Sequence, residues 1–460
     1  MPVPDISAGR LPACQYTDNF SDAHPPLTSV QALIEAERCY YCFDAPCVDA
    51  CPTGIDIPSF IRRISEDNVR GAARAILEAN VFGGICARVC PTEVLCEQAC
   101  VRNTNEDKPV EIGLLQRHAT DHVYDASGKS LFTRAAPTGK RIAVVGAGPA
   151  GLACAHRAAL LGHDVTVFEA RAKPGGLNEY GLATYKTVDD FAQKEIAWLL
   201  SIGGIEMRHG QALGEQILLS DLSRQFDAVF LGIGLRGVNA LGLADESTAG
   251  VGNAVEFIAG LRQAGDYAAV PVGRRVVVIG GGMTAVDAAV QSRKLGAEQV
   301  TIVYRRDEQR MPASKYEQDW ARLNGVTIRT WSVLKALDTI AGHVEAATFV
   351  SVRDVDGRLE PTGEPWRIEA DTVLKAIGQT LVLADPLLAT VELRGGRIDV
   401  TEVGRTSLAN VWAGGDCSWG GRDLTVEAVE HGKIAAHSID RALGVARNGA
   451  VFGRVRRVAA

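Results

Sequence analysis

The stretch RIAVVGAGPAGLACAHRAALLGHDVTVFEAR, residues 141–171, decides the fold. Apolar residues predict a buried parallel strand that leads into Gly146, Gly148 and Gly151, at the start of an Ala- and Leu-rich helix. A second apolar strand ends at Glu169. This order is the dinucleotide-binding fingerprint, in which glycines admit a pyrophosphate and the acid binds a ribose. A purely structural glycine turn is the alternative, and the full strand–turn–helix–strand context argues against it.

A second strand, glycine turn and helix follow further along the chain, with Gly280, Gly282 and Ala285 at the fingerprint positions. This internal repeat predicts that the chain binds two dinucleotides. The next strand ends at Arg305 and Arg306, where an arginine can accept the 2′-phosphate of NADPH. Because two acids follow directly, the preference for NADPH is mild, and a solvated turn is the alternative.

Two more glycine-bearing strands lie near the C-terminal end, within residues 371–379 and 410–416. The second ends at Asp416, ahead of a helix that we expect to begin near Val426. Such an Asp can bind the ribityl hydroxyls of a flavin, and the helix end can stabilise negative charge on reduced flavin. We therefore expect this segment to return to the lobe of the first fingerprint. The lobe of the second fingerprint, which would bind the nicotinamide dinucleotide, is then an insertion within the first lobe.

The composition is that of an ordinary globular protein. The 460 residues are 47% hydrophobic and 22% charged, and the net charge is −7. Because there is no basic tract, nothing indicates nucleic acid or an anionic membrane as a partner. No apolar run reaches the length of about 18 residues that a membrane span needs, and the first residues show no signal core. The sequence therefore predicts a cytoplasmic protein.

Eight of the eleven cysteines are crowded into one short segment. They form two groups of four, each with a Cys-Pro step: Cys39, Cys42, Cys47 and Cys51, then Cys86, Cys90, Cys96 and Cys100. Without a secretion signal, such crowding indicates metal or redox chemistry before disulfides. The groups are similar to ferredoxin-type iron–sulfur runs, although the spacing differs. Two structural zinc sites are the alternative, and the flavin fingerprint argues for clusters because a redox cofactor can exchange electrons with them.

The predicted fold class is an α-helical N-terminal iron–sulfur domain followed by two α/β Rossmann-like dinucleotide-binding domains, the second inserted in the first. We place the helical domain with two clusters at 1–138, the FAD-binding domain at 139–250 and 373–445, the NAD(P)-binding domain at 251–372, and a tail at 446–460. Within the first domain, we expect an irregular arm over 1–27, a capping box at Thr28–Gln31, and short amphipathic helices over 55–64 and 69–79.

Longer blocks carry a family resemblance: RCYYCFDAPCVDACPTGIDIPSFI (38–61), GGICARVCPTEVLCEQAC (83–100) and IGLLQRHATDH (112–122). Together with GAGPAG, GGL, GGGMTA, YRRDEQRMPAS, AIGQ and AGGDC, they make residues 30–440 resemble the glutamate synthase small subunit family. Within that family the chain looks most like the NAD(P)H-oxidising part of dihydropyrimidine dehydrogenase, which in bacteria is a separate subunit. The third block and the IDIPSFI run separate it from ordinary glutamate synthase small subunits.

The resemblance implies two [4Fe–4S] clusters with interleaved ligands. The implied ligands are Cys39, Cys42, Cys47 and Cys100 for one cluster, and Cys51, Cys90, Cys96 and Gln116 for the other. The cysteine pattern alone favours Cys86 as the eighth ligand, whereas the resemblance makes Cys86 a buried structural thiol. A glutamine oxygen is harder than a thiolate and changes the charge of its cluster, so the two clusters should differ in potential.

The resemblance also implies a flavin contact at Lys186, where dihydropyrimidine dehydrogenase has an arginine. The full set of candidate dinucleotide-binding residues is Gly146, Gly148, Pro149, Ala150, Gly151, Glu169, Gly176, Leu177, Lys186, Gly280, Gly282, Met283, Thr284, Ala285, Arg305, Arg306, Ala376, Gly378, Gly415, Asp416 and Thr425. Hydride transfer needs no acid–base residue on this chain, and we nominate none as catalytic.

By resemblance, electrons pass between NAD(P)H and a partner subunit through FAD and the two clusters. The partner would carry FMN and iron–sulfur clusters, interconvert uracil or thymine and their 5,6-dihydro forms, and form a hetero-oligomer with this chain. One alternative is a related subunit that feeds glutamate synthase or another reductase. The other is a non-enzymatic adaptor with a vestigial redox fold, which the intact fingerprints and cysteine groups argue against.

Overall fold

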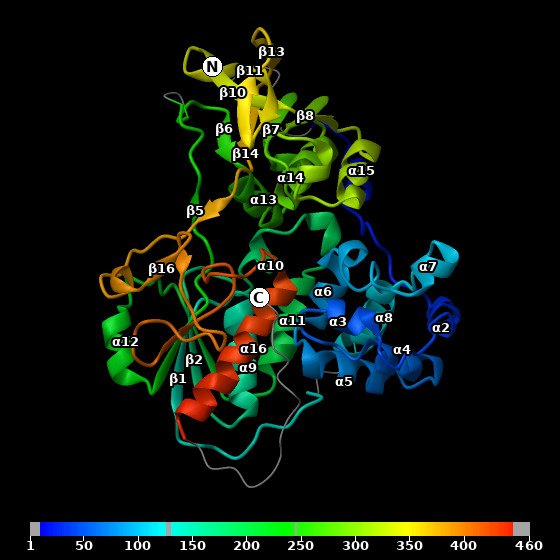
Figure 1. The fold of residues 1–460 in the computed structure, drawn as a ribbon, viewed down its shortest axis with the longest axis vertical. Helices are drawn as coiled ribbons and strands as arrows, with labels where there is room; N and C mark the ends of the chain where they lie inside the picture. The colour runs from blue at the N-terminus through cyan, green and yellow to red at the C-terminus, as the bar shows by residue number, and fades with distance from the viewer. Residues whose placement is uncertain (1–9, 126–129, 244–245, 445–460) are drawn as a thin grey trace. The chain divides into compact units, whose positions relative to one another are not determined.

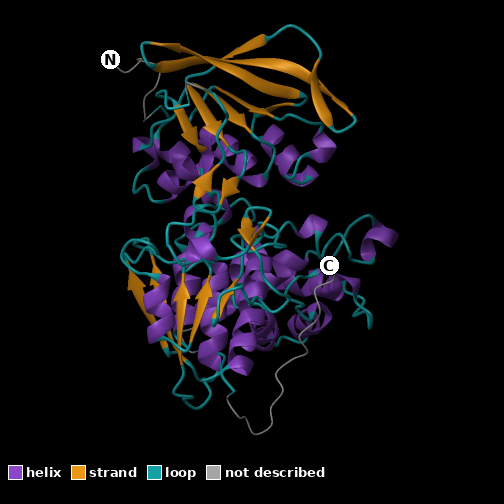
Figure 2. Ribbon diagram, turned by 60° about the vertical axis from the view of Figure 1, so that its left-hand side comes forward, coloured by secondary structure: helices purple, strands orange, loops and turns teal. Residues whose placement is uncertain are grey.

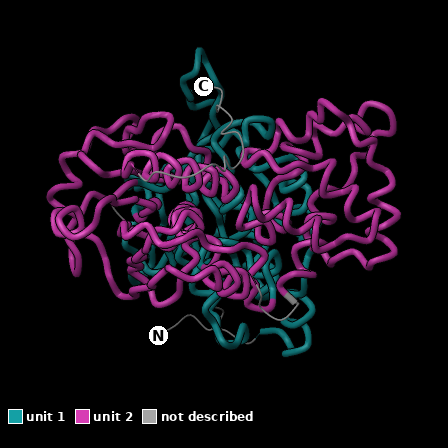
Figure 3. The backbone as a smooth tube through the Cα atoms, turned by 90° about the horizontal axis from the view of Figure 1, so that it is seen from below, with its two compact units in different colours: residues 1–23, 180–188, 237–380 teal, residues 24–179, 189–236, 381–460 magenta. Residues whose placement is uncertain are grey.

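The computed structural model describes residues 10–125, 130–243 and 246–444, and the tail predicted at 446–460 lies outside them (Figure 1). The chain divides into two compact units (Figure 3). Unit 1 comprises residues 1–23, 180–188 and 237–380, and unit 2 comprises residues 24–179, 189–236 and 381–460. Within the described residues, no helix combines the length and the apolar composition that crossing a bilayer requires.

The first part of unit 2 is helical and carries the two cysteine groups. Its helices are α2 (Ser29–Glu37), α3 (Pro46–Ala50), α4 (Ile57–Ser65), α5 (Val69–Ala79), α6 (Gly83–Val89), α7 (Arg102–Glu106) and α8 (Ile112–Asp125). The predicted capping box is confirmed, because the side chains of Thr28 and Gln31 each accept the other residue's backbone N–H. The two predicted amphipathic helices are confirmed as α4 and α5. Helix α4 begins two residues later than predicted because Asp56 caps it, accepting the Ser59 N–H at 3.1 Å.

The rest of unit 2 is built on a parallel sheet with strand order β18-β4-β1-β2-β3. Its strands are β1 (Arg141–Val145), β2 (Asp164–Glu169), β3 (Ile205–His209), β4 (Ala228–Leu231) and β18 (Val411–Ala413). Helix α9 (Pro149–Leu160) packs on β1 and β2, and α16 (Thr425–Ala442) packs on α9 and β18. Helix α12 (Leu219–Gln225) lies against β4, and α11 (Phe191–Leu200) contacts α6 and α8 of the helical part. Figure 2 shows the helices that flank this sheet.

Unit 1 repeats this architecture with the strand order β6-β14-β7-β8-β9. Its parallel strands are β6 (Val251–Asn253), β7 (Arg275–Ile279), β8 (Gln299–Val303), β9 (Thr327–Arg329) and β14 (Thr372–Lys375), and its helices include α13 (Ala254–Arg262), α14 (Met283–Lys294) and α15 (Lys315–Leu323). The unit also contains an antiparallel sheet that the sequence did not predict, formed by β10 (Ser332–Ile340), β11 (His343–Val355), β12 (Arg358–Pro361) and β13 (Trp366–Glu369). Two α/β lobes that follow a helical domain along the chain confirm the predicted fold class.

The strand β14 lies in a different sheet from the one the sequence suggested. The sequence predicts that residues from 373 onward belong to the lobe of the first fingerprint. In the structure Val373 pairs with Val277 of β7 and Val251 of β6, so β14 belongs to the sheet of unit 1. It occupies the same place beside the fingerprint strand that β4 occupies in unit 2. Two apolar, glycine-ended strands look alike in sequence, and only their pairing partners distinguish them.

The N-terminal arm is also more ordered than the sequence suggested. Residues Ala13–Asn19 form helix α1 in unit 1, within the segment predicted to be irregular and part of the iron–sulfur domain. Tyr16 and Phe20 are buried in the core of this unit, and the ring of Phe20 lies 4.5 Å from that of Tyr267. A helix this short is stabilised by tertiary packing and shows no clear amphipathic period in its sequence.

We predict that Gly432→Ala destabilises unit 2, because α16 crosses α9 with no room for a side chain. A Cβ at Gly432 would lie 2.1 Å from the carbonyl oxygen of Ala150 and 2.9 Å from the amide nitrogen of Cys154. Overpacking of this kind costs about 1–3 kcal/mol in the free energy of unfolding. Denaturant unfolding of the cofactor-loaded protein measures the loss.

The matched control is Gly260→Ala in α13, where a Cβ meets nothing within 4 Å. Alanine favours a helix over glycine by about 0.5–1 kcal/mol, so this variant should be neutral or more stable. Equal effects of the two substitutions would show that the close approach of α16 to α9 is unimportant.

Candidate functional site

The first fingerprint turn is a place where only glycine fits. Gly146 has φ +96°, and a Cβ there would lie 2.3 Å from the carbonyl oxygen of Gly232, at the end of β4. A Cβ at Gly151 would lie 1.9 Å from the carbonyl oxygen of Gly146. The chain therefore turns from β1 into α9 with backbone packed against backbone, as a pyrophosphate-binding turn requires.

The N-terminus of α9 is open to a ligand. Its N-cap is Gly148, which provides no side-chain cap, and Pro149 occupies the first turn. A helix start without a cap leaves N–H donors and the positive end of the helix dipole available to an anion. At the end of β2, the carboxylate of Glu169 accepts the N–H groups of Ala147 and Arg171, each at 2.8 Å. The predicted ribose acid therefore lies beside the predicted pyrophosphate turn.

Distant segments of unit 2 converge on this turn. A Cβ at Gly176 would lie 2.8 Å from the Cα of Gly148, so the GGL segment, in which Leu177 is 40% exposed, packs directly on the fingerprint. A Cβ at Gly415 would lie 3.0 Å from the Cβ of Ala150. The AGGDC strand end is thereby brought to the start of α9.

Asp416 and Thr425 lie at the same strand end and helix start. Burial raises the pKa of Asp416 to about 6, and Asp423 adds to this effect. Thr425 donates a hydrogen bond to Oδ1 of Asn178 at 2.8 Å, and within the described residues the buried Nδ2 of Asn178 has no acceptor. A buried donor without an acceptor suits a site that binds a polar group. Asn178 is not among the residues that the sequence predicts for this site, although it directly follows the GGL segment.

Unit 1 carries the second fingerprint in the same form. Gly280 has φ +147°, and a Cβ there would lie 2.2 Å from the carbonyl oxygen of Ala376. Helix α14 begins at Met283 and Thr284 after Gly282, which again provides no side-chain cap, and Ala285 is fully buried below the turn. Ala376 and Gly378 follow β14, so they lie with this fingerprint and not with the first.

The predicted phosphate arginines follow β8 in unit 1. Arg305 is exposed, and the buried Nε of Arg306 has no acceptor within the described residues. An exposed guanidinium and a second one with an unpaired Nε, within the described residues, fit the binding of a phosphate group at the second strand tip. The residues of both fingerprints therefore fit the two dinucleotides that the sequence predicts.

Lys186 belongs to unit 1, whereas the first fingerprint belongs to unit 2. Its ammonium group contacts Asp287 at 2.9 Å and Glu317 at 2.8 Å, and only a tenth of the side chain is exposed. Burial alone would lower the pKa of Lys186, but the two carboxylates outweigh burial and hold it well above its usual value. In this structure the side chain is committed to a buried ion triad. No motif in the sequence marks the two acids, which lie on α14 and α15.

The four cysteines that the resemblance implies for one cluster, called the first cysteine set from here on, lie around one cavity. Cys39, Cys42, Cys47 and Cys100 line it, together with apolar side chains that include Ile57, Ile61 and Ile112. Burial raises the pKa of Cys47 to about 12, and the neighbouring thiols of Cys39, Cys100 and Cys42 add to the effect. Four crowded thiols in an apolar cavity fit an iron–sulfur cluster, which binds them as thiolates.

The second cysteine set, which consists of Cys51, Cys90 and Cys96 with Cys86 as the alternative ligand, lies beside α6. The thiols of Cys86 and Cys90 share a hydrogen bond, which, with burial, raises the pKa of Cys90 well above its usual value, and Cys96 and Cys51 add to the effect. Gln116 is buried on α8, and its Nε2 donates to the carbonyl oxygen of Gly83 at 2.7 Å. Within the described residues, no three His, Cys, Asp or Glu side chains converge closely enough to hold a single metal ion.

Two family models match the chain. "Dihydropyrimidine dehydrogenase domain II, 4Fe-4S cluster" matches residues 16–127, and "Pyridine nucleotide-disulphide oxidoreductase" matches residues 140–432. The chain therefore belongs to the pyridine nucleotide-disulphide oxidoreductases, with a 4Fe–4S domain at its N-terminal side. It is an oxidoreductase whose cofactors are FAD, 4Fe–4S clusters and a nicotinamide dinucleotide.

Among its relatives is the NAD-dependent dihydropyrimidine dehydrogenase subunit PreT of Escherichia coli O157:H7, which is 34% identical over 93% of this chain and 98% of the relative. The glutamate synthase [NADPH] small chain of Escherichia coli K12 is 32% identical over 91% of this chain and 93% of the relative. The fold is also similar to Mycobacterium tuberculosis FprA in complex with NADPH, with a TM-score of 0.56, 18% identity, and coverage of 66% of this chain and 85% of that one. The predicted family is confirmed.

We predict that Lys186→Met destabilises unit 1 by about 3–5 kcal/mol, because it leaves Asp287 and Glu317 buried without a cation. The two carboxyl groups would then take raised pKa values in the folded state. The variant should therefore be most stable below the ordinary carboxyl pKa and lose stability as the pH rises through the raised values. Urea unfolding across the pH range measures both effects.

The control is Lys315→Met, which removes a lysine from an exposed pair with Asp319 in the same unit. An exposed pair contributes about 0–1 kcal/mol, so this variant should unfold like the parent. Similar losses in both variants would contradict the assignment of a buried triad.

Proposed function

We propose that the chain is the electron-input subunit of a dihydropyrimidine dehydrogenase. In this proposal electrons pass between NAD(P)H and a partner subunit that interconverts uracil or thymine and their 5,6-dihydro forms. One observation carries the proposal: the flavin fingerprint and both cysteine sets lie in the same compact unit. The name of the PreT relative supports the pyrimidine partner.

The residues proposed to bind FAD are the first fingerprint glycines, Glu169, the GGL segment, Asp416 and Thr425. The second fingerprint and its arginines would bind the nicotinamide dinucleotide. Bound FAD supplies the conversion between hydride chemistry and single electrons, and the chain's own groups hold and orient the cofactors. The helix start behind Asp416 would stabilise negative charge at the flavin.

We further propose the ligand sets Cys39, Cys42, Cys47 and Cys100, and Cys51, Cys90, Cys96 and Gln116. The hydrogen bond from Nε2 of Gln116 to Gly83 supports the role of this glutamine, because it leaves the oxygen end of the amide available as a ligand. Cys86 stays the alternative eighth ligand, since its thiol contacts that of Cys90.

A subunit that feeds glutamate synthase or another reductase is the second candidate. It is favoured by the similarity of the glutamate synthase small chain, which covers nearly the whole of both proteins. Co-purification of the natural partner distinguishes the two candidates.

We predict that the purified chain, kept free of air, reduces an artificial dye with NADH or NADPH but leaves uracil unchanged. The fingerprints provide for nicotinamide and flavin, whereas the pyrimidine chemistry is assigned to the partner. Separate titrations with the two nicotinamides, followed by dye and uracil assays, measure this. Uracil turnover by the chain alone would contradict the assignment of the pyrimidine chemistry to the partner. A visible spectrum that neither NADH nor NADPH bleaches would favour the non-enzymatic adaptor.

We predict that Gln116→Ala loses the second cluster, so that the iron content falls to about half of the parent value. The matched variant Cys86→Ala should keep its iron, because Cys86 is proposed to be structural. Iron analysis and low-temperature electron paramagnetic resonance of the reduced proteins measure both. The reverse outcome would assign the eighth ligand to Cys86.

A further inference from the structure

A buried carboxylate that the mechanism does not use lies on helix α11, at Glu195. Glu195 is fully buried and lies on the face of α11 that also carries Phe191, Trp198 and Leu199. A charged residue on an apolar helix face needs hydrogen-bond partners to offset the cost of leaving water. The hydrogen-bond partners of Glu195 therefore indicate its role.

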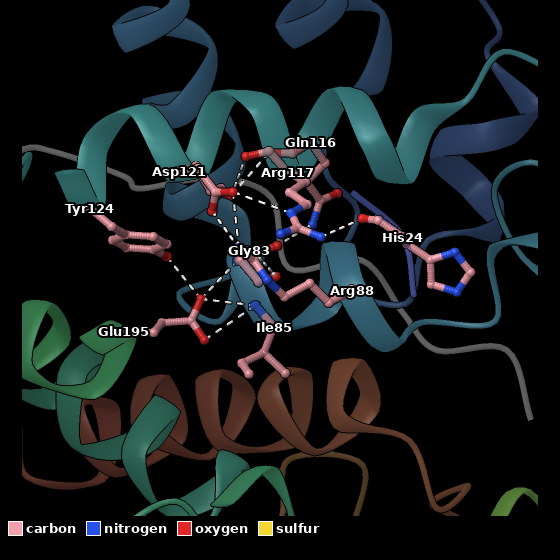
Figure 4. A network of polar contacts seen from close by, with 11 residues as sticks. His24, Gly83, Ile85, Arg88, Gln116, Arg117, Asp121, Tyr124 and Glu195 are labelled. Carbon is pink, nitrogen blue, oxygen red and sulfur yellow. Dashed lines mark hydrogen bonds and ion pairs between the residues drawn. The ribbon is translucent and has the colours of Figure 1, made fainter. Parts of the chain in front are cut away.

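Three donors point at this carboxylate from the helical domain (Figure 4). Its Oε1 accepts the N–H of Gly84 at 2.8 Å and the hydroxyl of Tyr124 at 2.8 Å. The N–H of Ile85 donates to both oxygens, at 3.2 and 3.3 Å. Two of these donors belong to the first turn of α6 and one to α8, so a residue of the flavin-binding fold fixes the iron–sulfur domain. Such charge-assisted bonds to backbone N–H groups are among the stronger ones in proteins.

Helix α6 connects this carboxylate to the second cysteine set. The helix carries Cys86, and Cys90 is its C-cap. Gly83, at its first position, accepts the hydrogen bond from Gln116. Both candidates for the eighth ligand therefore depend on where the start of α6 lies.

Packing leaves α6 little freedom at this end. A Cβ at Gly84 would lie 2.6 Å from the ring of Phe191 and 2.8 Å from Oε1 of Glu195. Arg88 donates to the carbonyl oxygen of Gly84 at 3.0 Å and forms a two-point ion pair with Asp121 of α8 at 2.8 and 2.9 Å. Its guanidinium also lies 3.4 Å from the centre of the Phe191 ring. The start of α6 is thus fixed between α8 and α11.

The charge of the carboxylate matters as well as its shape. Burial raises the pKa of Glu195 to about 7, against the opposing effects of Tyr124, the two backbone N–H groups and the cation of Arg88. These donors favour the anion, whereas an amide in its place would turn an N–H toward a donor. A Gln side chain can therefore fill the space, but its amide group would face the Ile85 N–H where the carboxylate presents Oε2.

We propose that Glu195 is a positioning residue for the second iron–sulfur cluster, which it acts on through the start of α6. The inference rests on the proposed function, since it assumes that the second cysteine set binds a cluster. It holds whether Gln116 or Cys86 is the eighth ligand, because both are tied to α6. The first cysteine set, which consists of Cys39, Cys42, Cys47 and Cys100, has no member on this helix.

The test is Glu195→Gln in the cofactor-loaded full chain, titrated anaerobically while electron paramagnetic resonance follows each cluster. We expect the midpoint potential and the g-values of the second cluster to shift, while the first cluster and the flavin content stay at parent values. The first cluster is therefore an internal control for folding. Equal shifts of both clusters, or of neither, would refute the role.

A second variant covers the case in which Glu195→Gln does not retain its cofactors. Tyr124→Phe keeps the carboxylate and the ring contacts with Phe191 and Trp198 but removes one donor. It should shift the second cluster alone, and by less. A Tyr124→Phe protein with two parent-like clusters would then refute the role. The control is Glu206→Gln, an exposed carboxylate on β3 of the same unit, which should leave both signals unchanged.

This experiment distinguishes the inference from the proposal on which it rests. If the parent protein contains iron for one cluster only, the proposed ligand set fails. If the parent contains two clusters and neither the Glu195 nor the Tyr124 variant changes the second one selectively, the positioning role fails while the proposed function stands.

Discussion

The structure depends on backbone packed against backbone at two glycine turns. In unit 2, Gly146 faces the carbonyl oxygen of Gly232, and in unit 1, Gly280 faces that of Ala376. Each contact joins the fingerprint turn to the end of the neighbouring parallel strand, with no space for a Cβ. The helix that follows therefore starts at the carboxyl edge of its sheet with its N–H groups uncapped, where open α/β sheets bind their ligands. The two sheets repeat the same strand order because each must supply this neighbouring strand.

Local signals explain what the sequence could predict. The fingerprints, the capping box at Thr28 and the helices α4 and α5 each depend on residues close together in the chain. The sheet to which β14 belongs depends on pairing with β6 and β7, which lie about a hundred residues earlier, and no local pattern encodes it. The same is true of α1, whose Tyr16 and Phe20 are buried by residues far along the chain. The candidate site residues of the sequence come from motifs, and a residue such as Asn178, which is marked only by a tertiary contact, is not among them.

Buried charges show this limit most clearly. The resemblance implies a flavin contact at Lys186 but says nothing of the ion pairs with Asp287 and Glu317, which no spacing in the sequence connects to it. Glu195 has only a weak signal in the sequence, because it is a charged residue on the otherwise apolar face of α11. Neither arrangement is an efficient way to stabilise a fold, because desolvation offsets much of the attraction between buried groups. Such groups therefore indicate a requirement for fixed geometry.

Fixed geometry is what the proposed electron route requires. Hydride transfer needs the nicotinamide only briefly, but single electrons tunnel between resident cofactors, and the rate of tunnelling falls steeply with distance. The first fingerprint, proposed to bind FAD, and both cysteine sets lie in unit 2, and the second fingerprint, proposed to bind the nicotinamide, lies in unit 1. The proposed one-electron steps on this chain would therefore take place inside one compact unit. There, the bonds from α6 and α8 to Glu195 hold the iron–sulfur domain against the flavin fold, so the separation of the cofactors follows from packing and not from the motion of a linker.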